Sequence, residues 1–458
     1  MASSPIHALK VLEQSSVSPP NSSVPETSIP LSFCDLMWLN LNHVERIFFY
    51  SIPTISTSHF IKHLLPPLKT SLSLTLQHFF PLAGHVIFSP DSDSKFHYHY
   101  NDGDSISFTV AESDRDFTHL AGDDARSVIE LESLVPALAA VSADATPLMA
   151  VLVTVFPSQG VCLGLTINHG ACDGSSAANF LKSWAATCKS GAASAVLSTT
   201  PLFDRSLFVY PKELHAPSLE FAMKSRELHS VTPSIHTTDH DLAKTDMVIA
   251  SFWLTRDQIE KLKRWISEEK KVGVHCSTFV VACAYVWTCQ VRARGSPTNQ
   301  VAWLGFPVNA RGRLRPPVPE GYFGNCLGVC LSNVEVGELV KEDGLRVAAE
   351  VLGREVDGLG DGVLGDVDAW VEMGKVFKDE RPLSVSGSPG FRVYDSDFGW
   401  GRPVKVEVVS LRNTTGAMSI SEGKDGGGIG IGLAAPKMEM ERFSFEFAQG
   451  LDQLLHSC

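Results

Sequence analysis

The sequence predicts an α/β protein built from two domains, and three observations support this. The chain has 458 residues, which is too many for one ordinary hydrophobic core and suggests two domains of roughly 200 residues each. Strand-like and helix-like segments alternate in both halves. A Gly-, Ala- and Ser-rich stretch followed by proline-punctuated sequence separates the halves. We therefore predict domains over residues 1–190 and 231–458, joined by a crossover linker over 191–230.

In the first half, the clearest elements are two β-rich runs and the helical pattern that follows them. MAVLVTVF (149–156) and VCLGLTIN (161–168) are separated by PSQG, which predicts a strand–turn–strand unit. The next apolar residues recur at helical spacing, with Ser175 or Ser176 available as the N-cap. Earlier in the chain, residues 14–30 are rich in Ser and Pro, which indicates an extended lead-in.

The second half repeats the alternation of strands and helices. MVIASFWL (247–254) predicts a strand, and a charged amphipathic helix should run from about 256 to 270. An apolar helix is expected over 277–294, followed by a strand that ends at Asn309. The stretch 340–365 mixes charge with many glycines, which is typical of a helix plus an exposed loop.

Composition and charge exclude several classes of function. Hydrophobic residues make up 44% of the chain and charged residues 19%, and the formal net charge is −13. A nucleic-acid-binding protein needs a basic face, yet the longest basic run is KLKR at 261–264, so we expect no nucleic-acid partner. No window approaches the roughly 18 apolar residues of a membrane span. The N-terminus does not resemble a secretory signal, which favours a cytoplasmic location.

Cysteine spacing and two polar or glycine-rich segments give no evidence of a cofactor site. The ten cysteines occur singly and form no CxxC pair, so we expect free thiols and no zinc ribbon. HTTDHD (236–241) lacks companion ligands, and we interpret it as a solvated loop, so no metal is expected. DGGGIGIG (425–432) does not match a phosphate-binding loop, and we interpret it as a turn into a final strand.

The segment NHGACDGSS (168–176) carries the strongest candidate for chemistry. Acyl transfer to a hydroxyl needs a base, and histidine serves because its pKa lies near neutral pH. His169 follows a predicted strand and is surrounded by small residues that would let substrates approach. Asp173 lies four positions later, beside Gly174 and near a helix N-terminus, where a carboxylate is favoured.

This HxxxD spacing is weak evidence when taken alone. The chain has 16 histidines, so roughly one such spacing is expected by chance. A second example, His119 to Asp123, lies among charged residues and has no strand leading into it, so we do not expect it to be functional. His169 could equally be a hydrogen-bonded core histidine on this evidence.

A second motif, DFGWG at 397–401, favours the catalytic interpretation of His169. With HxxxDG near the middle of the chain and DFGWG towards its C-terminus, the sequence resembles the BAHD family of plant CoA-dependent acyltransferases. The resemblance implies two chloramphenicol-acetyltransferase-like α/β domains with the active site in a tunnel between them, a monomer, and no metal. Further matching segments span essentially the whole chain: FCDLMWLN (33–40), VERIFFY (44–50), LQHFFPLAGHV (76–86), STFVVACAYVWTC (277–289) and VNARGRLRPPVPEGYFGNC (308–326).

The resemblance implies roles for the catalytic loop. His169 would deprotonate the acceptor hydroxyl, which then attacks the thioester carbonyl. Asp173 would point away from the substrate and pair with an arginine, because a lone buried carboxylate is costly. We choose Arg311 as that partner, with Arg313 as the alternative. Cys172 departs from the usual pattern, and we interpret it as a packing residue rather than a reactive thiol.

The resemblance also implies roles outside the catalytic loop. Asp397 would be a second acid that is required for activity through architecture, although it is sometimes counted as catalytic. Gly399 would allow a tight turn that buries Trp400. Ser277 and Thr278, at a helix N-terminus, would be available to the phosphates of coenzyme A. The sequence offers no clear candidate for the group that stabilises the oxyanion.

The segments YFGNC (322–326), GSPGFRVYDSDFGWGRPVKVE (387–407) and MSISEGKDGGGIGIGL (418–433) are similar to the clade that acylates anthocyanins and other phenolic glucosides. The resemblance implies malonyl-CoA as the favoured donor, with hydroxycinnamoyl-CoA as the alternative. A malonyl group needs a cation for its carboxylate, whereas coumaroyl needs an apolar slot. Lys182 is the only cation near the first turn of the helix after His169, so malonyl stays only a preference.

Three rival functions deserve comparison. A non-catalytic acyltransferase-like binding protein would have no reason to keep both motifs. A hydrolase would need a nucleophile, but GxSxG is absent from the sequence. N-acylation of a polyamine would use the same residues with a different acceptor, and the sequence leaves that alternative open.

Overall fold

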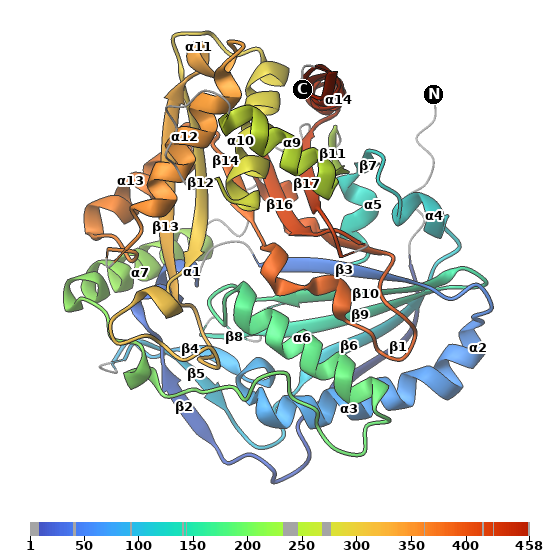
Figure 1. The fold of residues 1–458 in the computed structure, drawn as a ribbon. Coiled ribbons are helices and arrows are strands. Elements are labelled where there is room, and N and C mark those ends of the chain that lie inside the picture. The colour runs from blue at the N-terminus through green and yellow to red at the C-terminus, as the bar shows by residue number, and fades with distance from the viewer. Residues whose placement is uncertain are drawn as a thin grey trace.

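The computed structural model describes residues 9–39, 43–91, 94–139, 142, 144–231, 246–267, 276–360, 362–414, 416–424 and 426–456. Within these residues the strands form a six-stranded, a seven-stranded and a four-stranded sheet, and helices pack against the two large sheets (Figure 1). This arrangement confirms the predicted α/β class. The predicted HTTDHD loop (236–241) lies outside the described residues.

The six-stranded sheet contains the predicted strand–turn–strand unit. Strands β9 and β10 pair in antiparallel register, and every residue of both is buried, which explains their continuous apolar sequence. The strand order is β1-β6-β9-β10-β3-β15. The strands are β1 (Lys10–Val17), β6 (Ile106–Glu112), β9 (Met149–Phe156), β10 (Gly160–Ile167), β3 (Val44–Ser51) and β15 (Lys405–Val408).

The predicted extended lead-in over 14–30 contains the end of strand β1 and all of strand β2. Strand β1 forms one edge of the six-stranded sheet, and β2 forms one edge of the small sheet. Both are edge strands, and neither contains the continuous apolar run of a central strand such as β9. In order, the small sheet contains β2 (Thr27–Pro30), β5 (Phe96–Tyr100), β4 (His85–Phe88) and β8 (Ala145–Pro147).

The seven-stranded sheet is built around the second half of the chain. The predicted strand over 247–254 and the strand ending at Asn309 are confirmed. The predicted turn and strand over 425–432 are confirmed for residues 426–432, where a turn leads into β17. In order, its strands are β13 (Leu327–Glu335), β12 (Val301–Asn309), β14 (Leu383–Ser386), β16 (Ala417–Glu422), β17 (Ile429–Pro436), β11 (Met247–Leu254) and β7 (Arg126–Ser127).

Helices cover the seven-stranded sheet, with α10 in the middle of the group (Figure 1). The sequence predicted α10 and α12, and predicted the start of α9. Almost every residue of α10 is buried, because it contacts both α12 and α14. The helices of this half are α9 (Arg256–Ser267), α10 (Thr278–Arg294), α11 (Val336–Leu339), α12 (Gly344–Asp357), α13 (Val367–Asp379) and α14 (Lys437–His456).

Helices α3 and α6 lie side by side on one face of the six-stranded sheet (Figure 1). The Trp184 indole of α6 donates a hydrogen bond to the Leu68 carbonyl of α3 at 3.2 Å. The linker segment 191–230 contains most of a helix that the sequence analysis did not predict, α7, which packs against α1. The helices here are α1 (Phe33–Trp38), α2 (Thr57–His59), α3 (Leu65–His78), α4 (Phe117–Leu120), α5 (Val128–Glu132), α6 (Gly174–Lys189) and α7 (His215–Val231).

Two short strands cross between the halves of the chain. Strand β7 comes from the first half but joins the seven-stranded sheet, and β15 comes from the second half but joins the six-stranded sheet. Each large sheet therefore contains one strand from the opposite half. The domain boundaries at residues 190 and 231 stay a prediction.

A network of buried charges links these two exchanged strands. The Arg126 guanidinium on β7 donates to the Glu407 carboxylate on β15 at 2.6 Å, and both side chains are at most 1% exposed. Lys405 lies between Glu407 and Asp123, at 3.5 and 2.8 Å. Burial lowers the pKa of Lys405, although the carboxylates favour its charge. Because each charge has a partner, the network joins the two halves without leaving an isolated buried ion.

Candidate active site

His169 lies on the loop between β10 and α6, where the sequence predicted it. The Trp38 ring stacks on the His169 ring, with centroids 4.3 Å apart and planes inclined by 16°. Its Nδ1 is buried and has no hydrogen-bond partner of good geometry among the described residues, whereas Nε2 is not among the buried atoms. Nε2 is therefore the ring nitrogen that a substrate could reach.

The surroundings of His169 favour the neutral ring. Burial lowers the pKa of His169 below its ordinary value, and the charge of Arg46 acts in the same direction. Its own backbone carbonyl, Asp173 and the Asn325 side chain oppose that shift. A neutral imidazole with an accessible Nε2 can accept a proton, which is the requirement for a general base.

Asp173 holds the loop to the second half of the chain. Arg311, which follows β12, donates to the Asp173 carboxylate at 2.6 Å, and both side chains are buried. This is the predicted ion pair, whereas Arg313 donates to the Asn309 carbonyl instead. The Cys326 amide donates to the same carboxylate at 3.1 Å. The loop that carries His169 is therefore fixed where the two halves of the chain meet.

The predicted N-cap of the helix after His169 was wrong. Asp173, and not Ser175 or Ser176, caps α6, because its carboxylate accepts a hydrogen bond from the Ser176 amide at 3.0 Å. Gly174 follows the cap and lies against the Phe391 ring. A β-carbon at Gly174 would come within 2.5 Å of that ring, so a larger residue here would require the Phe391 ring to shift.

The loop 322–326 forms a second support for His169 that the sequence analysis missed. The Asn325 side chain donates to the carbonyls of His169 and Gly170 at 3.0 and 3.3 Å. Asp35, which is fully buried on α1, accepts hydrogen bonds from the amide and side chain of Asn325 at 2.8 and 3.1 Å. The available signal was a polar residue inside each of two otherwise apolar motifs, FCDLMW and YFGNC.

Removing the Asn325 amide should disturb the position of His169 without removing any reacting group. We expect Asn325→Ala to lower kcat by about tenfold to a hundredfold with a smaller change in KM, because small misplacements of catalytic groups are costly. Steady-state kinetics would measure this. Asn333→Ala, an exposed position near the far end of β13, serves as the matched control. A change in KM with kcat unchanged would contradict the positioning role.

The DFGWG segment forms a tight turn far from His169. Asp397 accepts hydrogen bonds from the Gly399 and Gly401 amides at 2.8 and 3.0 Å and pairs with Lys189 at 2.7 Å. Burial alone would raise the pKa of Asp397, but these contacts hold it below its ordinary value. Lys189 is the last residue of the 16-residue helix α6, so Asp397 lies about 24 Å along the helix from Asp173.

The glycines of this turn have the backbone geometry that the sequence suggested. Gly399 and Gly401 adopt φ angles of 93° and 91°, in the region that other residues rarely occupy. The turn places the Trp400 ring edge-on against Tyr50 and Phe60. Asp397 therefore supports the packing around α6 and does not touch His169.

Ser277 and Thr278 lie at the start of α10, as predicted. The Ser277 hydroxyl accepts a hydrogen bond from the Val280 amide at 3.2 Å and so caps the helix.

Cys172 is buried, and burial raises the pKa of its thiol, which agrees with a packing role. The nine cysteines that the structure describes are free.

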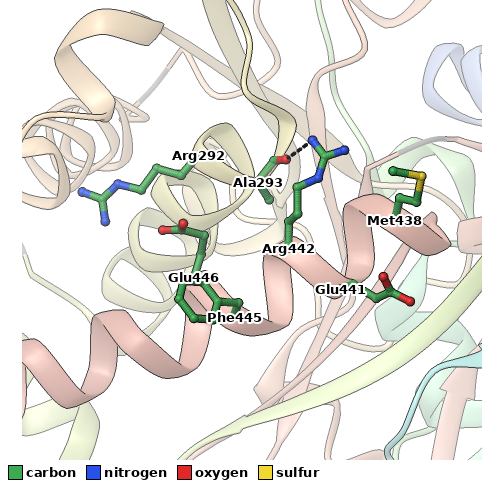
Figure 2. A pocket seen from close by; sticks show the side chains of 7 residues that line it. All are labelled: Arg292, Ala293, Met438, Glu441, Arg442, Phe445 and Glu446. Atoms are coloured by element: carbon green, nitrogen blue, oxygen red, sulfur yellow. Dashed lines mark hydrogen bonds between the residues drawn. The ribbon is translucent and has the colours of Figure 1, made fainter.

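A surface hollow lies elsewhere, between the end of α10 and the outer side of α14 (Figure 2). Arg442 reaches across it to the Ala293 carbonyl at 3.4 Å, and Met438 and Phe445 are exposed beside it. The hollow contains none of the predicted site residues, so it is separate from the His169 loop.

Among the helices that the structure describes, none has the length and apolar character of a membrane span.

The lowered pKa of His169 predicts the acid limb of the pH profile. A base must be unprotonated, so activity should persist as pH falls through about 6.5, the ordinary histidine pKa, and decline only at lower pH. The pH dependence of kcat/KM reports this value for the free enzyme. An acid limb centred above pH 6.5 would contradict the assignment.

Comparison with known proteins gives the family that the sequence motifs indicated, and the matches cover nearly the whole chain. A family model described as the Transferase family matches residues 9–449. Phenolic glucoside malonyltransferase 2 of Arabidopsis thaliana is 36% identical over 452 residues, covering 97% of this chain and 99% of the relative. Agmatine coumaroyltransferase of the same plant is 37% identical over 446 residues, covering 95% and 98%.

A solved structure supports the fold. Vinorine synthase matches with a TM-score of 0.67 at 20% identity, covering 95% of this chain and 96% of that one. This likeness confirms the predicted two-domain architecture of the chloramphenicol-acetyltransferase type. The family match extends over nearly all of the chain and includes both the loop that carries His169 and the DFGWG turn. The chain therefore belongs to the Transferase family of BAHD acyltransferases and is an acyl-CoA-dependent enzyme.

Proposed function

We propose that this enzyme transfers a malonyl group from malonyl-CoA to a sugar hydroxyl of a phenolic or flavonoid glucoside. The observation that carries this proposal is the setting of His169: its ring stacks on Trp38, its Nε2 is the nitrogen that a substrate could reach, and burial lowers its pKa and so favours the neutral ring. The names of relatives that act on phenolic glucosides support the acceptor class.

In the proposed reaction, His169 Nε2 takes the proton of the acceptor hydroxyl as its oxygen attacks the thioester carbonyl carbon. The tetrahedral intermediate then collapses, the carbon–sulfur bond breaks, and the protonated His169 returns the proton to the departing thiolate. Asp173 carries no proton in this scheme. Its bond to Arg311 holds the loop in place, and Asp397 acts through the packing at the other end of α6.

Coenzyme A would lie in a tunnel between the two domains, with its phosphates near Ser277 and Thr278. The start of α10 offers backbone amides and a favourable helix dipole to an anion. The enzyme is also proposed to act as a monomer in the cytoplasm and to need no metal ion.

The test is turnover by the purified protein with malonyl-CoA or coumaroyl-CoA and a panel of flavonoid glucosides. Free coenzyme A and product mass are measured together. Product with malonyl-CoA supports the proposal. Product only with coumaroyl-CoA, or with an amine such as agmatine, would replace the donor or acceptor and keep the enzyme class. Ligand binding without turnover would favour a non-catalytic binding protein.

A further inference from the structure

Arg46 places a cation beside the catalytic loop, on a strand far from it in the sequence. On β3, Arg46 pairs with Leu165 of β10 and with Val408 of β15. Side chains alternate along a strand, so Arg46 lies on the same face as Phe48 and Tyr50, which belong to the core that includes α6. Arg46 therefore points to the side of the sheet on which α6 begins.

The guanidinium of Arg46 has no direct partner within the described residues. In the part of the chain that the structure describes, no carboxylate lies within 4.0 Å of the Arg46 guanidinium, and the guanidinium makes no hydrogen bond. Its Nε is buried, but its two terminal nitrogens are not among the buried atoms. A partly buried arginine without a partner lowers the stability of the folded protein. A contribution to stability therefore does not explain why an arginine lies here.

The neighbours of Arg46 connect it to the reacting end of the site. The Phe391 ring lies 6.0 Å from the guanidinium carbon, and the same ring contacts Gly174 at the start of α6. His169 and Cys172 lie within its electrostatic reach. Arg46 therefore shares the Phe391 ring with the start of α6 and acts electrostatically on the loop that carries the base.

Glu422 is an acidic group whose charge acts on Arg46. One of its oxygens accepts a hydrogen bond from the Tyr394 amide at 2.7 Å, and the other is buried with no partner among the described residues. Glu422 attracts Arg46 through space but forms no ion pair with it. Glu422 thus offsets part of the charge of Arg46 and leaves the guanidinium fork free.

We propose that Arg46 binds the free carboxylate of a dicarboxylic acyl donor such as malonyl-CoA. This inference rests on the proposed function and assigns to Arg46 the selection of the acyl donor. In a malonyl thioester the carboxylate is separated from the reacting carbonyl by one methylene, so its cation must lie beside His169. A guanidinium can bind a carboxylate through two parallel hydrogen bonds. Lys182, the cation noted in the sequence, instead lies near Asp395.

The test compares malonyl-CoA with acetyl-CoA, which lacks the carboxylate. Equilibrium binding of both is measured by calorimetry on protein that carries His169→Ala, with and without Arg46→Met. We expect Arg46→Met to weaken malonyl-CoA binding by about tenfold or more, the effect of one charge-assisted hydrogen bond. Acetyl-CoA binding should change by less than about twofold.

Steady-state kinetics with active His169 provide the second readout. The ratio of kcat/KM for malonyl-CoA to that for acetyl-CoA should fall by about tenfold in Arg46→Met and recover in part in Arg46→Lys. Arg292→Met, a substitution of the same type at the remote hollow of Figure 2, should leave the ratio unchanged.

The outcomes separate this inference from the proposed function. Equal losses with both donors in Arg46→Met would overturn the inference and make Arg46 a structural partner of Glu422. An unchanged ratio in an active enzyme would overturn it as well. Wild-type enzyme that uses coumaroyl-CoA and does not bind malonyl-CoA would overturn the inference while keeping the transferase. Absence of turnover with every acyl-CoA would overturn the proposed function itself.

Discussion

Replacing His169 with alanine should lower kcat/KM for acyl transfer by about 10²–10⁴-fold, the contribution usual for a general base. The ring contacts Trp38 on one side and exposes only Nε2 to a substrate. Removing it leaves the loop held by Asp173 and Asn325 through contacts that do not use the imidazole ring. The effect should therefore fall on catalysis rather than on folding.

His119→Ala is the matched control for this experiment, because His119 and Asp123 repeat the HxxxD spacing. The His119 side chain is 46% exposed and lies 3.4 Å from Glu130, away from the candidate active site. We expect full activity from this variant. Circular dichroism and thermal unfolding of both variants would separate lost chemistry from lost structure. Similar residual activity in the two variants would remove His169 from the role of base.

Replacing Glu407 with glutamine should lower the free energy of unfolding by about 3–5 kcal/mol, as is usual when one partner of a buried ion pair is removed. The Arg126 guanidinium would lose its carboxylate at 2.6 Å inside the protein. Lys405, only 1% exposed, would keep only the partly exposed Asp123 as its close carboxylate among the described residues. Two neighbouring buried cations would then repel each other between the exchanged strands.

Thermal unfolding at fixed scan rate and protein concentration would measure this loss, because a protein of this size need not unfold in one step. Glu350→Gln makes the same substitution in a surface pair with Arg354 on α12. That pair should contribute less than about 1 kcal/mol. Equal shifts in melting temperature for the two variants would contradict a special role for the buried network.

The secondary structure around His169 could be predicted because its signals are local. The apolar runs of β9 and β10 and the helical spacing after His169 are each contained within a few residues. The N-cap was missed because Ser, Thr and Asp are all good caps. Only the contacts of Asp173, which also binds Arg311, selected it over Ser175.

Strands β7 and β15 could not be predicted. They contain two and four residues, too few for an alternating pattern to stand out. Their place is decided by partners far along the chain, such as Glu407 for Arg126, 281 residues away. The charged residues of these strands look like surface residues in the sequence, but they become buried because they neutralise one another.

The sequence by itself determined the α/β class, the family resemblance, the base His169 as a candidate and the need of Asp173 for an arginine partner. Only the tertiary structure decided which groups surround that base. Asn325 and Asp35 come together across 290 residues, and Arg46 reaches the loop from a neighbouring strand. The physical reason is that motifs report local chemistry, whereas burial, charge pairing and accessibility depend on contacts that form only when the chain has folded.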